Sequence, residues 1–165
     1  MRPLTPARDI GLLIARALLG FVVAAHGYQK FFMNGMDATA TAFEGMGVPL
    51  PAVSAWAAGL IELVGGILLI LGALTPIVGI LVTFVMIGAA VFVHIGNGIF
   101  ASDGGWELVA VIALAAMTFA LVGPGRYSVD HALTGRRGDS VDAKDADRTV
   151  ETRDSDRVGA TAERR

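Results

Sequence analysis

The stretch that decides the fold is residues 52–95, which reads AVSAWAAGLIELVGGILLILGALTPIVGILVTFVMIGAAVFVHI and carries one charged residue, Glu62. A membrane-spanning helix needs about 20 mostly apolar residues to cross roughly 30 Å of hydrocarbon. The stretch is long enough for two such helices, residues 52–74 and 77–95, joined by a very short turn at residues 75–76. A turn of that length makes the two helices antiparallel neighbours.

The low density of charge continues on both sides of this stretch. Residues 10–123 hold only seven charged residues: Arg16, Lys30, Asp37, Glu44, Glu62, Asp103 and Glu107. About a quarter to a third of a water-facing surface is normally charged, so a soluble globular enzyme is excluded. Residues 10–27 and 106–122 are predicted as two further spans. The predicted fold class is therefore all-α: a polytopic membrane protein, an antiparallel bundle of four transmembrane helices. A cleaved signal peptide is the alternative for the first segment, but Arg16 interrupts its apolar run.

The chain changes character after the fourth span. Residues 124–165 hold nine basic and nine acidic residues, and residues 136–165 have too few apolar side chains to offset the entropy of ordering them. Two parts are predicted: a membrane domain over residues 1–135 and a disordered charged tail over residues 136–165. Lys and Arg concentrate at both flanks of the bundle, so the positive-inside rule places both termini in the cytoplasm.

Composition also narrows the chemistry. The absence of Cys excludes disulfides, thiolate-ligated zinc, iron–sulfur clusters and thiol redox chemistry. The sequence offers no nucleophile with a neighbouring base and no metal-ligand spacing, so no catalytic residue and no metal site is predicted. The net charge of −2 gives no footprint for a nucleic-acid partner.

Two ionisable residues lie within the predicted spans, where a charge costs on the order of 2.5–3.5 kcal/mol at mid-helix. Glu62 lies near the bilayer centre, on the same helix face as Gly59 and Gly66. Such a face lets another helix approach closely. Three interpretations are open: a buried pair of Glu62 with Arg16, a Glu62 site for a proton or a ligand, and a packing clamp in which Arg16 is a structural polar residue.

A second polar group gathers at the outer ends of the helices: His26, Gln29, Lys30, Asn34, His94, Asn97 and Glu107. Their predicted depths agree, so they can meet in a small pocket that binds a quinone head group, relays protons or holds a small anion. A b-type haem on two histidines is the less favoured cofactor. The alternative is an interfacial belt, because polar residues are common at helix ends. The candidates for ligand binding or proton relay are His26, Lys30, Glu62, His94 and Glu107.

Residues 123–131, which follow the fourth span, are interpreted as structural. Arg126 can reach back to the last carbonyls of the helix, where the helix dipole favours a cation. Ser128 or Asp130 can cap a short helix that runs to about Leu133.

Five short motifs occur in order along the chain: RALLG at 16–20, HGYQKF at 26–31, ELVGG at 62–66, LGALT at 71–75 and GPGRYSVD at 123–130. Their order and spacing resemble the DoxX family of small bacterial four-helix membrane proteins, over roughly residues 8–133. That family often has a basic residue after the threonine of the fourth motif. Pro76 stands there in this chain, so no charge-dependent role is expected at that position.

The resemblance implies a multi-pass protein of the bacterial inner membrane. Relatives include a subunit of an archaeal thiosulfate:quinone oxidoreductase and an actinobacterial scaffold that joins a superoxide dismutase to a sulfurtransferase. We therefore expect a non-catalytic membrane component of a redox or oxidative-stress complex of thiol or sulfur metabolism. Its expected partners are the lipid bilayer, soluble redox enzymes and, as an option, further copies of the chain.

Two alternatives stay open beside this expectation. One is a quinone-linked oxidoreductase subunit of the thiosulfate:quinone type, with quinone as its cofactor. The other is a small-molecule transporter, which rests on the intramembrane carboxyl alone. The directions of side chains 26, 30, 62, 94 and 107 separate these hypotheses. Convergence on one cavity favours ligand binding, whereas scattered positions favour a scaffold.

A topology measurement checks the predicted orientation. We expect alkaline phosphatase fused after Arg165 to be inactive, and the same enzyme inserted into residues 96–105 to be active, because it folds only outside the cytoplasm. A fluorescent protein fused to the C-terminus should give the reciprocal pattern. An active phosphatase at either terminus contradicts the prediction.

Overall fold

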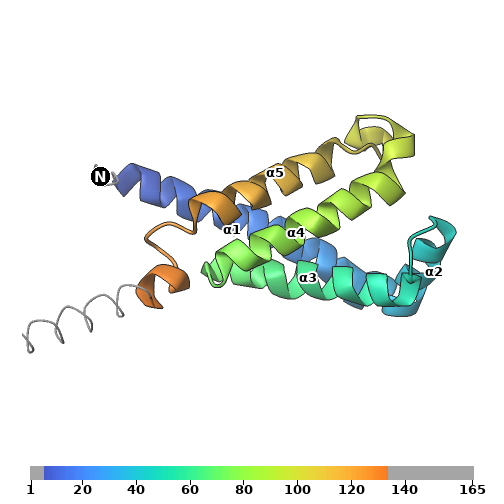
Figure 1. Cartoon of the computed structure of the whole chain (residues 1–165), viewed down its shortest axis with the longest axis horizontal. Coiled ribbons are helices and arrows are strands. Elements are labelled where there is room, and N and C mark those ends of the chain that lie inside the picture. The colour runs from blue at the N-terminus through green and yellow to red at the C-terminus, as the bar shows by residue number, and fades with distance from the viewer. Residues whose placement is uncertain (1–5, 134–165) are drawn as a thin grey trace, which may run out of the picture. The chain divides into compact units, whose positions relative to one another are not determined.

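A computed structural model describes residues 6–133 of the chain, and every regular element in that range is helical (Figure 1). The four main helices are α1 (Pro6–Tyr28), α3 (Pro51–Leu71), α4 (Thr75–Ala89) and α5 (Glu107–Val122). The short elements are α2 (Met36–Gly45), the π-helical segments η1 (Gln29–Asn34) and η2 (Ala90–His94), and the 3-10 turns η3 (Ile95–Asn97) and η4 (Ala101–Asp103). The tail predicted for residues 136–165, and the boundary before it, lie outside the described residues.

The main helices have the character of membrane spans. Three continuous helical stretches are long and apolar enough to cross a bilayer: Pro6–Asn34, Pro51–Leu71 and Thr75–Asn97, with 29, 21 and 23 residues. α5 is also apolar but has 16 residues, fewer than the roughly 20 that a straight crossing needs. The predicted all-α membrane fold is confirmed, with the fourth helix shorter than a typical span.

Residues 28–51, which connect the first two predicted spans, are helical over most of their length. α1 continues through η1 to Asn34, and α2 follows after Gly35. The first predicted span ends at Gly27, but in the structure Gly27 lies inside α1. A side chain there would collide with the backbone of Leu63 in α3. In this bundle the glycine marks a close helix contact and not a helix terminus.

Glycines on both sides bring α1 and α3 together along their length (Figure 1). A Cβ added at Gly20 would lie 2.5 Å from the carbonyl oxygen of Gly66, and one added at Gly66 would lie 2.6 Å from that of Gly20. A Cβ added at Gly27, close to the C-terminal end of α1, would likewise collide with the backbone of Leu63 in α3. The small-residue face predicted around Glu62 is therefore the surface on which α1 packs, and these contacts set the antiparallel register.

The second pair of helices is α4 and α5, which pack through Gly79 against Ala116 and Ala120. The buried apolar core is made by Leu19, Val23, Leu69, Val78, Val82, Met86, Val109, Ile112, Ala116 and Phe119. α3 and α4 meet at their shared turn, but α3 packs mainly on α1 and α4 mainly on α5. In Figure 1 the two helices separate as they leave the turn.

Two charged side chains, Arg16 and Asp130, join the segment after α5 to α1 and to the turn between α3 and α4. Arg16 is fully buried and donates hydrogen bonds to the carbonyl oxygens of Pro124 and, at 2.8 Å, of Tyr127. The Asp130 carboxylate accepts hydrogen bonds from the backbone N–H groups of Leu74, at 2.7 Å, and Thr75, at 2.9 Å. Asp130 thus satisfies amides at the start of α4, which would otherwise lack partners.

These contacts correct three details of the sequence interpretation. The direct pair of Arg16 with Glu62 is wrong, because the register places Arg16 beside Gly72 in the turn, ten residues after Glu62 along the chain. Asp130 caps α4, although residues 129–133 do form the expected short helix. Arg126 is exposed and makes no hydrogen bond to α5 within residues 6–133.

Replacing Gly66 by leucine tests the packing of α1 on α3. We expect Gly66→Leu to destabilise the bundle by about 2–3 kcal/mol, since the added side chain meets backbone atoms of α1 that cannot rotate away. Gly11→Leu is the matched control, because it also adds leucine to a helical glycine and its Cβ meets nothing within 4 Å. The measurement is the thermal unfolding midpoint in detergent. Equal midpoints for the two variants would contradict the packing.

Candidate functional site

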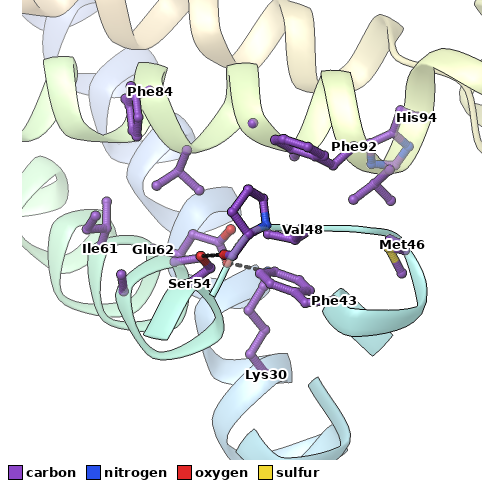
Figure 2. Close-up of a pocket in the computed structure, with 17 residues that line it drawn as sticks. Lys30, Phe43, Met46, Val48, Ser54, Ile61, Glu62, Phe84, Phe92 and His94 are labelled. Atoms are coloured by element: carbon purple, nitrogen blue, oxygen red, sulfur yellow. Dashed lines mark hydrogen bonds and ion pairs between the residues drawn. The ribbon is translucent and has the colours of Figure 1, made fainter. Parts of the chain in front are cut away.

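A cavity of about 450 Å³ lies between α3 and α4 and is closed on a third side by α2 and the chain that follows it (Figure 2). This volume falls within the range of about 300–1,000 Å³ that is typical of small-molecule sites. The walls are apolar apart from a few side chains. The residues that line it are Lys30, Phe43, Met46, Val48, Pro49, Ser54, Ala57, Ala58, Ile61, Glu62, Phe84, Val85, Gly88, Ala89, Phe92, Val93 and His94.

The helix register brings Lys30 to Glu62. Because Gly27 of α1 lies against Leu63 of α3, the next turn of the first helix lies level with Glu62. The Lys30 Nζ atom donates a hydrogen bond to Glu62 Oε2 at 2.5 Å, and the two side chains are 19% and 4% exposed. The intramembrane carboxyl therefore has a cation as its partner, supplied by the end of the first helix.

This ion pair is only partly saturated. A Lys ammonium has three N–H donors, and a carboxylate accepts at both oxygens. Among the described residues, Lys30 has one acceptor and the second oxygen, Oε1, of Glu62 accepts no hydrogen bond. Both side chains line the cavity (Figure 2). A molecule in the cavity can therefore accept a hydrogen bond from the ammonium or donate one to the carboxylate.

His94 lines the same cavity from α4's side (Figure 2). Its ring Nδ1 lies 2.6 Å from the carbonyl oxygen of Gly104. Because a carbonyl only accepts, Nδ1 is the donor in this contact. Nε2 is therefore the ring nitrogen of His94 that is left for a ligand.

Both basic side chains of the cavity come from π-helical segments. Lys30 belongs to η1 and His94 to η2, which continue α1 and α4. π-helical turns are rare, and they occur frequently at functional sites because they change the direction of side chains within a helix. The two segments flank one cavity, which supports its interpretation as a binding site.

The other predicted site residues lie elsewhere. His26 is half-buried in α1, does not line the cavity and has no hydrogen-bond partner within residues 6–133. Glu107 accepts a hydrogen bond at 2.7 Å from the backbone N–H of Ala101 and so holds the loop before α5. Three of the five candidates, Lys30, Glu62 and His94, thus converge on one cavity. The two histidines considered as haem ligands do not share it.

The sequence analysis missed most of the wall. Phe84, Gly88 and Phe92 recur at intervals of four residues along one face of α4 and η2, and Ser54, Ala58 and Ile61 form the opposite wall on α3. α4 is apolar on every side, so no change of polarity along the helix marks the face that lines the cavity. The i, i+4, i+8 spacing of Phe-Gly-Phe was the available signal.

A double-mutant cycle tests the ion pair. Lys30→Met leaves the Glu62 carboxylate without its partner, and Glu62→Leu leaves the ammonium, so each is expected to lower stability by about 3–5 kcal/mol. The double variant should be more stable than either single one, since it removes both charges from an apolar site. The measurement is the midpoint of thermal or denaturant unfolding in detergent. Additive losses in the double variant would contradict a direct buried pair.

Comparison with known proteins agrees with this architecture. The DoxX family model matches residues 11–95. "Putative oxidoreductase CatD" of Bacillus subtilis is 32% identical over 82% of this chain and 96% of its own length. "Inner membrane protein YphA" of Escherichia coli is 32% identical over 75% of this chain and 91% of its own. An uncharacterized membrane protein of Mycobacterium tuberculosis is 30% identical over 76% and 82%.

No solved structure matches the chain. The family model covers half of the sequence, including the first three spans and the Lys30–Glu62 pair, and the similar proteins extend the likeness over most of the remainder. The chain is a membrane protein and belongs to the DoxX family.

Proposed function

We propose that this protein is a quinone-binding membrane subunit of a redox system. The observation that carries the proposal is the convergence of Lys30, Glu62 and His94 on one apolar cavity between membrane-spanning helices. Ligand sites for small molecules combine apolar walls with a few placed polar groups. A quinone has the matching chemistry, with a flat apolar ring and two oxygens at opposite edges.

The polar groups suit both redox forms of such a ligand. The carbonyl oxygen of a quinone accepts a hydrogen bond, which the free N–H groups of Lys30 can donate. The hydroxyl of a quinol donates one, which Glu62 Oε1 or His94 Nε2 can accept. The two forms differ by two protons and two electrons. In this proposal the carboxylate and the imidazole exchange the protons, and a partner redox protein exchanges the electrons.

The surroundings of the site fit this role. The proposed partners are soluble redox enzymes, to which a membrane subunit presents the quinone. In the proposed setting, a bacterial inner membrane with both termini in the cytoplasm, quinones are dissolved in the same hydrocarbon that solvates the helices. One similar protein, CatD, carries the word oxidoreductase in its name.

Because convergence on a cavity favours ligand binding over a pure scaffold, the scaffold role is proposed as secondary, and no observation favours the transporter.

Quinone content of the purified protein tests the proposal. We expect the wild-type chain, purified in mild detergent and passed through gel filtration, to retain quinone that organic extraction and chromatography detect. Glu62→Gln replaces the carboxylate by a neutral amide with a single acceptor oxygen, which removes the ion pair with Lys30, and it should lower retention about tenfold, as the loss of one hydrogen bond to a charged group predicts. Glu44→Gln is the matched control, because Glu44 is exposed and does not line the cavity.

Two results would overturn the proposal. One is a folded wild-type protein that binds no quinone, whether native or added. The other is equal retention by the wild type, Glu44→Gln and Glu62→Gln, since quinone bound in that manner would lie outside the cavity.

A further inference from the structure

The cavity has an apolar side that the ion pair does not explain. On α4 and η2, Phe84, Gly88 and Phe92 line it on one helix face, and Phe84 and Phe92 remain 74% and 41% exposed. On α3, the lining residue Ala57 is exposed as well. The cavity therefore opens at the protein's side, between α3 and α4, and not only toward the loops.

The depth of this opening follows from the helix lengths. Glu62 lies nine residues before Leu71 at the end of α3, and Phe84 lies nine residues after Thr75 at the start of α4. At 1.5 Å per residue, both lie roughly 14 Å from the shared turn. Since the hydrocarbon layer is about 30 Å thick, the side opening at Phe84 faces the middle of the bilayer, where acyl chains and not water surround the protein.

Gly88 leaves a gap in the wall of this opening. A Cβ added there meets nothing within 4 Å, so no packing contact inside the bundle requires a glycine. Ala57 and Ala58 on α3 and Ala89 on α4 are equally small. The two phenylalanines one turn to either side of Gly88 then form the ends of a short apolar channel. Aromatic and small side chains of this kind provide apolar contacts for an unbranched or isoprenoid chain.

We infer that the cavity is entered sideways from the hydrocarbon, and that it takes long-chain quinones whose tail lies along Phe84, Gly88 and Phe92 while the ring lies beside Lys30 and Glu62. This inference rests on the proposed function and names the class of quinone. A tail in this channel makes van der Waals contacts with the helix wall, and such packing is what drives association inside a bilayer. Tail length therefore contributes to binding, and a quinone without a tail binds through the head group alone.

A tail-length series tests the inference on the unmodified protein. The wild type, stripped of native quinone, is offered three quinones with the same ring and with no tail, a ten-carbon tail and a long isoprenoid tail. Bound quinone is measured by extraction after gel filtration. We expect affinity to rise with tail length, with at least about a tenfold difference between the extremes.

Two variants place the tail. Gly88→Leu and, from the opposite wall, Ala57→Leu should lower binding of the long-chain quinone about tenfold more than binding of the tailless quinone, because they fill the channel that the tail would occupy. Gly11→Leu is the matched control, since it adds the same side chain to an exposed helical glycine outside the cavity. It should bind all three quinones as the wild type does.

The outcomes separate this inference from the proposed function. If the wild type binds no quinone of any tail length, the proposed function fails. If it binds the tailless and the long-chain quinone equally, or if both wall variants keep full binding of the long-chain quinone, the sideways entry is wrong and the head-group site stands. Displacement of the long-chain quinone by a phospholipid at equal concentration would also overturn the inference, since the channel would then be a lipid site.

Discussion

Close packing of α1 on α3 through facing glycines is the constraint on which the rest of the structure depends. Gly20, Gly27 and Gly66 let the two backbones touch, and in a membrane such van der Waals contact is a main source of helix association, since lipid is as apolar as the side chains. The contact also fixes the sliding register of the two helices. That register places Lys30 level with Glu62, which gives the buried carboxylate its partner, and it places Arg16 beside Gly72 in the turn.

The cavity is a consequence of how the four helices are paired. α3 packs chiefly on α1 and α4 on α5, so α3 and α4 share only their turn and the core beside it. Asp130 holds that turn through the amides of Leu74 and Thr75, and the helices part beyond it. Polar side chains at membrane depth are costly, and here Lys30 and Glu62 line a cavity between helices that can admit a ligand. An ion pair there keeps the site neutral overall while leaving hydrogen-bonding positions open.

Much of the fold could be predicted from the sequence, because apolar length and turn residues report directly on membrane spans. The small-residue face around Glu62 could also be predicted, from helical periodicity. The partner of Glu62 could not, because pairing Arg16 or Lys30 with it depends on register, and register depends on which glycines touch. Gly27 illustrates the difficulty: the same residue type ends helices and joins them. The cavity wall on α4 was hidden because that helix is apolar on all sides, and the role of Asp130 depended on a contact between segments 55 residues apart.

The central claim is that a quinone ring occupies the cavity beside the Lys30–Glu62 pair. The most direct measurement is photochemical labelling in membranes with a light-activated quinone, followed by mass spectrometry of the labelled peptides. The account predicts that labels concentrate on residues 54–62 and 84–94 and disappear when excess unlabelled quinone is added. Labels spread over the lipid-facing surfaces of α1 and α5, unaffected by competing quinone, would contradict it.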